Sequence, residues 1–128
     1  MSSTRSPAEM QISSPILLIE DEVLIAMAMC DELVEAGFDV RCAYNFDDAQ
    51  QMIANGKFQA AILDFDLKGR SSAPLAAALK RNGVPIVGCS GSATDGQEAA
   101  FAGLQVLAKP YSAADLVDAV QRAVATKD

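Results

Sequence analysis

Five polar residues stand at or directly after the ends of short apolar runs. Glu20 and Asp21 follow the first run, Asp64 the third, Ser90 the fourth and Lys109 the fifth. Carboxylates that lie close together repel one another and raise each other's pKa, so a fold keeps such a group when a cation offsets the charge. A ligand set of few protein oxygens favours Mg2+ over Ca2+, which binds more of them. A lysine and a hydroxyl aimed at the same place suit a phosphoryl group bound together with the metal.

The apolar runs predict strands of a buried parallel sheet, because they are short, unbroken and alternate with helical patterns. The predicted strands cover residues 15–19, 38–43, 60–63, 85–89 and 106–108. Helices are predicted between them, from apolar spacing and end signals, over residues 23–36, 45–55, 74–81 and 112–124. In a doubly wound parallel sheet the ligand site lies beyond the carboxyl ends of the strands. The five polar residues are therefore expected to meet there.

Length and composition narrow the class of protein. The 128 residues suit one domain, which we assign to residues 15–128, preceded by a flexible polar arm at residues 1–14. The net charge of −7 repels phosphate backbones, so nucleic acid is not an expected partner. No apolar run approaches the roughly 18 residues of a membrane span, which predicts a cytoplasmic protein without membrane contact. The chain has no histidine, and Cys30, Cys42 and Cys89 lie in apolar segments, which indicates reduced core thiols.

Four motifs resemble the receiver domains of bacterial two-component signalling, whose fold is that of the chemotaxis response regulator. The motifs are Ile19-Glu20-Asp21-Glu22, Ile62-Leu63-Asp64, Cys89-Ser90-Gly91 and Ala108-Lys109-Pro110-Tyr111. The resemblance covers residues 15 to about 126. It implies a flavodoxin-like α/β fold, a doubly wound five-stranded parallel sheet with strand order 2-1-3-4-5.

The resemblance also implies a role for each site residue. Asp64 is expected to accept a phosphoryl group, with Mg2+ held by Glu20, Asp21, Asp64 and the backbone carbonyl of Asp66. Ser90 and Lys109 are expected to contact the phosphoryl oxygens, and the Lys109-Pro110 bond is expected to be cis. The donor would be a sensor histidine kinase or a histidine phosphotransfer protein. The chain would act as a stand-alone response regulator that switches a surface for a target protein, and would not be an enzyme beyond its own phosphotransfer and dephosphorylation.

The sequence departs from the common receiver pattern in two places. Many receivers carry an aromatic residue shortly before the Lys-Pro pair, whereas this chain has Val106 and Leu107, so an aromatic switch there is not expected. Three glycines lie between Ser90 and Gln105, and glycine destabilises a helix interior, so the fourth helix of the family is predicted to be short or absent. The segment after Asp64 lacks the usual Met-Pro and is similar to that of a receiver subgroup widespread in alphaproteobacteria.

Two other functions are compatible with parts of the pattern. The triplet Asp64-Phe65-Asp66 resembles the Asp-x-Asp of haloacid-dehalogenase-type phosphatases, but that motif usually follows the first strand, and a second acidic pair is expected late in the chain. The second alternative is a receiver-like interaction module that works without phosphorylation. Phosphatase turnover on a generic ester separates the first alternative from a receiver, and phosphorylation of Asp64 separates the second.

Overall fold

The computed structural model describes residues 14–91 and 99–126 of the chain. Within them a five-stranded parallel sheet has the order β2-β1-β3-β6-β7. Its strands are β1 (Ile16–Ile19), β2 (Val40–Ala43), β3 (Ala60–Asp64), β6 (Ile86–Ser90) and β7 (Gln105–Ala108). Counted along the chain without the short strands β4 and β5, this is the predicted order 2-1-3-4-5, so the fold prediction is confirmed. The predicted arm, residues 1–14, lies outside the described residues except for Ser14.

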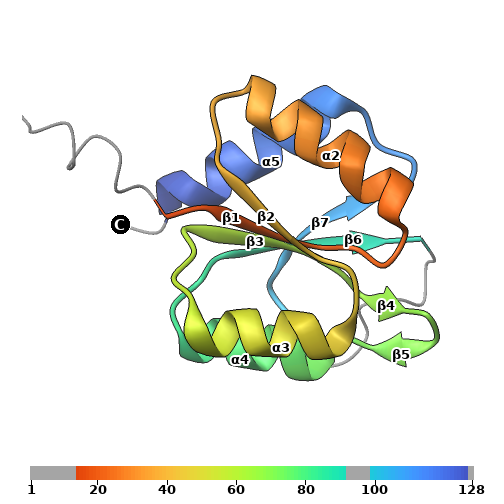
Figure 1. The fold of residues 1–128 in the computed structure, drawn as a ribbon, viewed down its shortest axis with the longest axis vertical. Coiled ribbons are helices and arrows are strands. Elements are labelled where there is room, and N and C mark those ends of the chain that lie inside the picture. The colour runs from red at the N-terminus through yellow and green to blue at the C-terminus, as the bar shows by residue number, and fades with distance from the viewer. Residues whose placement is uncertain (1–13, 92–98, 127–128) are drawn as a thin grey trace, which may run out of the picture.

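Helices cover both faces of the sheet (Figure 1). One face carries α2 (Val23–Glu35) and α5 (Ala113–Thr126), and the other carries α3 (Phe46–Asn55) and α4 (Ala73–Arg81). The helices begin and end near the predicted signals, with Asn45 accepting a hydrogen bond from the Asp48 N–H at the start of α3. No helix among residues 14–91 and 99–126 combines the length and the apolar character that crossing a membrane requires.

Two hydrophobic cores form because successive side chains of a strand point to opposite faces of the sheet. In β1, Leu17 and Ile19 belong to the core beneath α3 and α4, while Ile16 and Leu18 belong to the core beneath α2 and α5. All four side chains are fully buried. This burial on both faces explains why the central strands read as unbroken apolar runs.

Helix α2 carries large apolar residues on both its buried and its exposed sides. The helix buries Ala26, Met29 and Leu33 against the sheet. By contrast, Leu24 is 79% exposed and Met27 is 53% exposed. The first half of α2 is apolar nearly all round, so spacing predicts the helix correctly without identifying its buried side.

The segment after Asp64 contains a feature that the sequence did not predict. Residues 66–72 read as a polar loop, but strands β4 (Asp66–Leu67) and β5 (Arg70–Ser71) pair there as an antiparallel hairpin. The connection is the two-residue turn Lys68-Gly69, and both residues have positive φ, 53° and 81°. Such turns match the twist of a hairpin, and a lysine at the first position gives little sequence signal for one. The hairpin projects beside the carboxyl ends of the sheet strands (Figure 1).

The connection between β6 and β7 agrees with the expectation of a short or absent fourth helix, as far as it is described. Residues 92–98 lie outside the described residues, and the described part holds only the 3₁₀ turn η1 (Ala99–Phe101). Phe101 is buried, and its ring stacks on the ring of Phe65 with centroids 4.0 Å apart. The stack connects this turn to the residue that follows Asp64.

Candidate functional site

The predicted site residues lie at the carboxyl ends of four neighbouring strands. Glu20 follows the last residue of β1, Asp64 ends β3, Ser90 ends β6 and Lys109 follows β7. The strand registers bring these ends level, since Ile19 pairs with Leu63, Asp64 with Cys89, and Ser90 with Ala108. The parallel sheet therefore gathers residues that are up to 89 positions apart in sequence at one edge.

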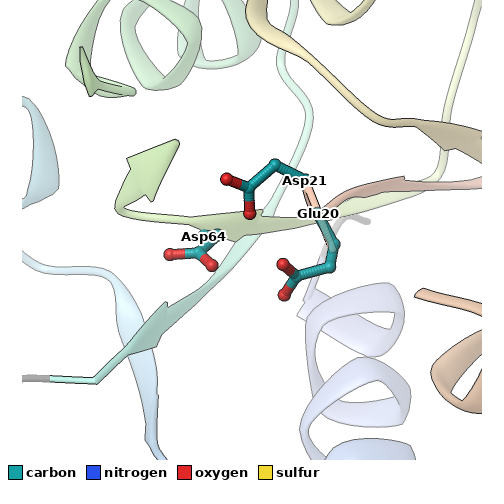
Figure 2. A group of neighbouring side chains, drawn as sticks. All are labelled: Glu20, Asp21 and Asp64. Atoms are coloured by element: carbon teal, nitrogen blue, oxygen red, sulfur yellow. The ribbon is translucent and has the colours of Figure 1, made fainter. Parts of the chain in front are cut away.

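Three carboxylates form a cluster at this edge (Figure 2). Glu20, Asp21 and Asp64 each offer one oxygen, and these oxygens all lie within 4.8 Å of one another. Glu20 is only 2% exposed and Asp64 only 7%, whereas Asp21 is half-buried. A cluster with this spacing and one open side has the form of a divalent cation site.

Lys109, which follows the edge strand β7, reaches into the carboxylate cluster. Its Nζ lies 2.9 Å from Oδ2 of Asp64 and 3.7 Å from Oε1 of Glu20. The backbone of the same lysine is fixed, because its N–H donates to the carbonyl of Ser90 at 2.8 Å. The Lys109-Pro110 peptide bond is cis, as expected. The ammonium group and the end of β6 are thus held next to Asp64.

Glu20 and Lys109 both have a raised pKa, and the charges in the cluster contribute to both shifts. Burial, together with the nearby charge of Asp64, raises the pKa of Glu20 to about 7. Burial alone would lower the pKa of Lys109, but its hydrogen bond to Asp64 and the charges of Asp64 and Glu20 outweigh burial, so its pKa is raised. When ionised, three carboxylates face one ammonium, which leaves an excess of negative charge that a divalent cation would offset.

The structure places Asp66 and Ser90 beside the cluster without fixing their predicted contacts. The N–H of Asp66 donates to Oδ1 of Asp64 at 3.1 Å, and the Asp66 side chain is exposed. Ser90 is 9% exposed at the end of β6. The Asp66 carbonyl as a metal ligand and the Ser90 hydroxyl as a phosphoryl contact stay predictions.

Sequence reasoning missed Ser72, which touches the phosphoacceptor candidate directly. Its side chain is completely buried, and its Oγ donates to the backbone carbonyl of Asp64 at 2.7 Å. The sequence signal at this position, a serine shortly before Pro74, suggests the start of a helix and gives no sign of a contact eight residues back.

A cleft of about 270 Å³ opens beside the cluster, between the β4–β5 hairpin and the start of α3. Its lining includes Asp21 and, from the hairpin, Lys68 and Arg70. The guanidinium of Arg70 stacks on the Phe46 ring at 3.6 Å and lies 3.8 Å from a carboxylate oxygen of Asp47. The contacts of Arg70 with Phe46 and Asp47 thus connect the hairpin to the first turn of α3.

The thiol of Cys89, which is buried near the site, stays protonated and is therefore unreactive. Burial raises the pKa of Cys89 to about 12, so the thiol is neutral at ordinary pH. The neighbouring Tyr111 donates its hydroxyl to Sδ of Met29 at 3.3 Å, and burial, with the nearby Cys89, raises its pKa as well. The thiol of Cys89 and the hydroxyl of Tyr111 are therefore both neutral near pH 7, and neither adds negative charge to the carboxylate cluster.

Comparison with known protein families identifies the class. The family model for the response regulator receiver domain matches residues 16–121, and the chain belongs to that family. Among functionally curated proteins, none matches the sequence significantly.

Solved receiver domains have the same fold. A response regulator receiver protein from Sinorhizobium medicae is 22% identical, with a TM-score of 0.79 over 91% of this chain and 98% of that one. The receiver domain of a sensor histidine kinase from Pseudomonas aeruginosa is 22% identical, with a TM-score of 0.78 over 89% and 99%, and holds a magnesium ion in its active-site cleft. A putative response regulator from Chloroflexus aurantiacus is 26% identical, with a TM-score of 0.76 over 88% and 98%.

Proposed function

We propose that this protein is a phosphoacceptor of a two-component system, in which Asp64 receives a phosphoryl group from a phosphohistidine. The observation that carries the proposal is the convergence of three carboxylates and the ammonium of Lys109 at the carboxyl ends of adjacent strands. Membership of the receiver family supports the same function.

Mg2+ is the metal that fits this donor set best. Glu20, Asp21 and Asp64 would hold it, together with the carbonyl of Asp66. All of these donors are hard oxygens, and they are too few for a dedicated Ca2+ site, which suits an ion that keeps several waters. When bound, Mg2+ would offset the excess negative charge of these carboxylates and would supply a positive charge for phosphoryl oxygens next to Asp64.

The chain's own residues account for the transfer step. A carboxylate oxygen of Asp64 attacks phosphorus, the phosphorus–nitrogen bond of the phosphohistidine breaks, and an acyl phosphate forms. Lys109, now 2.9 Å from Asp64, is placed to pair with the incoming phosphoryl oxygens, and Ser90 at the end of β6 to hydrogen-bond them. Asp66 donates its N–H to Oδ1 of Asp64 and keeps the carboxylate oriented. Water later hydrolyses the acyl phosphate and restores the Asp64 carboxylate, and because this recovery is slow, little multiple turnover is expected.

The proposed partners follow from this chemistry. The phosphoryl donor is a sensor histidine kinase or a histidine phosphotransfer protein, and the phosphorylated form would present a changed surface to a target protein. The three free cysteines are consistent with the reducing cytoplasm as the site of action. The assignment of residues 15–128 to the receiver unit and of residues 1–14 to an arm is part of the proposal. That the domain works without an attached output domain stays a prediction, and the mass of the protein isolated from its own cells checks it.

The experiment is to incubate the protein with Mg2+ and a small acyl phosphate and to follow its mass. The wild-type protein should gain one phosphoryl group, and Asp64→Asn should gain none. Asp66→Asn is the matched control, because it alters only an exposed side chain and keeps the backbone, so it should be phosphorylated like wild type. Phosphorylation of Asp64→Asn at the wild-type rate would overturn the assignment.

A further inference from the structure

Ser72 stands immediately before helix α4 yet does not cap it. A serine in this position normally accepts a hydrogen bond from a backbone N–H in the first turn of its helix. The Ser72 side chain makes no such bond. Its neighbour Ser71 accepts one instead, from the N–H of Ala73 at 3.1 Å. The hydroxyl of Ser72 therefore does not cap α4 and can make another contact instead.

That other contact is the peptide unit between Asp64 and Phe65. Oγ of Ser72 donates to the carbonyl of Asp64 at 2.7 Å, and the N–H of Phe65 donates to the carbonyl of Cys89 at 3.1 Å. The same peptide unit is therefore held at both ends, by Ser72 on one side and by strand β6 on the other.

Ser72 also holds the next peptide unit. Its backbone N–H donates to the carbonyl of Phe65 at 3.1 Å. The N–H of that second peptide unit belongs to Asp66 and donates to Oδ1 of Asp64 at 3.1 Å. A single buried residue thus fixes two consecutive peptide units, and the second of these orients the Asp64 carboxylate.

We propose that Ser72 is a positioning residue for the phosphoacceptor: its hydroxyl holds the carbonyl of Asp64 and its backbone N–H holds the carbonyl of Phe65, and together they set the direction of the Asp64 carboxylate and the placement of Asp66 next to it. The proposal rests on the proposed function of Asp64. Ser72 acts through the backbone of residues 64 to 66, and the hydroxyl is fully buried at 0% exposure, so solvent does not compete for the contact. Groups that orient a metal ligand from behind typically change metal affinity or activity by about 10–100-fold when removed.

The test compares Ser72→Ala with Ser71→Ala, each measured well below its melting temperature. Ser72→Ala should weaken Mg2+ binding and slow phosphorylation by a small acyl phosphate, each by about tenfold. Ser71→Ala removes the hydroxyl that accepts from the Ala73 N–H at the helix start, so its Mg2+ affinity and phosphorylation rate should stay within about twofold of wild type. The carboxyl carbon resonance of Asp64 in the metal-free protein should shift in Ser72→Ala and not in Ser71→Ala.

A third variant keeps the test valid if Ser72→Ala does not fold. It also separates an effect of Ser72 on stability from an effect on the position of the Asp64 carboxylate. Ser72→Cys keeps a donor group at this position, although the thiol is larger and donates more weakly, and it should fall between wild type and Ser72→Ala in Mg2+ affinity. If both Ser72 variants melt at lower temperature but keep wild-type Mg2+ affinity, rate and Asp64 resonance, the hydroxyl is only structural and the inference is overturned. If the wild-type protein itself neither binds Mg2+ nor is phosphorylated, the proposed function fails instead, and the Asp64 resonance still tests the positioning.

Discussion

The buried carboxyl of Glu20 makes a quantitative prediction about pH. Its pKa in the folded, metal-free protein is about 7, against an ordinary value of 4.5. The folded state therefore binds the proton more tightly than the unfolded state, and this contribution to stability is fully present below pH 4.5 and lost as pH rises through 7. The difference corresponds to about 3 kcal/mol of unfolding free energy. Urea denaturation in chelator should show the metal-free protein losing stability between pH 5 and pH 7.5.

Mg2+ binding should show the opposite pH dependence, because the ion and the proton compete for the same carboxylate. With a pKa of about 7, the ionised fraction of Glu20 falls about 25-fold between pH 7.5 and pH 5.5, and the apparent Mg2+ affinity should fall by the same factor. Isothermal titration calorimetry measures this affinity directly. Repeating it near pH 6 in two buffers of different ionisation enthalpy should show release of nearly one proton.

The control is Glu20→Gln, which keeps an oxygen at the site but removes the titrating group. It should bind Mg2+ more weakly than wild type, with an affinity that hardly changes between pH 5.5 and pH 7.5. A wild-type affinity that varies less than about threefold over this range would show that Glu20 is already ionised in the folded protein, and the reasoning from burial would be refuted.

Three further predictions concern single side chains. Asp21→Ala should abolish the rise in melting temperature that millimolar Mg2+ gives the wild-type protein, and a persisting rise would place the metal elsewhere. Gly88→Ala should lower the unfolding free energy by about 1–3 kcal/mol, because the added Cβ would overlap the ring of Phe65; unchanged urea denaturation would contradict this packing. Asn45→Ala should cost about 1 kcal/mol by removing the acceptor that lies 2.8 Å from the Asp48 N–H, whereas Asn45→Ser should retain most of that stability in the same assay.

The sheet and the carboxylate cluster could be predicted because both depend on residues next to one another in sequence. An apolar run followed by an acidic or basic residue predicts a buried strand with a polar end. Parallel strands then bring those ends together whatever the connecting helices are. Glu20, Asp64 and Lys109 meet for this reason, and their convergence follows from the strand order alone.

The features that escaped prediction depend on distances across the fold. The Lys68-Gly69 turn has a non-glycine residue at positive φ, which local preference disfavours, so the β4–β5 hairpin reads as a loop. Ser72 reads as a helix cap, and only the folded chain shows its hydroxyl on the Asp64 carbonyl. The sequence does not show which face of α2 is buried, because apolar residues lie on both its buried and its exposed sides.

The stacked rings of Phe65 and Phe101 have a mechanical consequence for the segment around Asp64. Phe65 is 3% exposed, and its ring fills the space where a side chain of residue 88 would otherwise project from β6. Phe65 therefore cannot shift toward the sheet, and a shift away from it must either displace Phe101 or open an empty space in a close-packed core. A movement of the backbone next to Asp64 would therefore displace the 3₁₀ turn at residues 99–101 or leave an empty space beside Phe65. The contact between the two rings would thus couple a displacement next to Asp64 to the connection between β6 and β7.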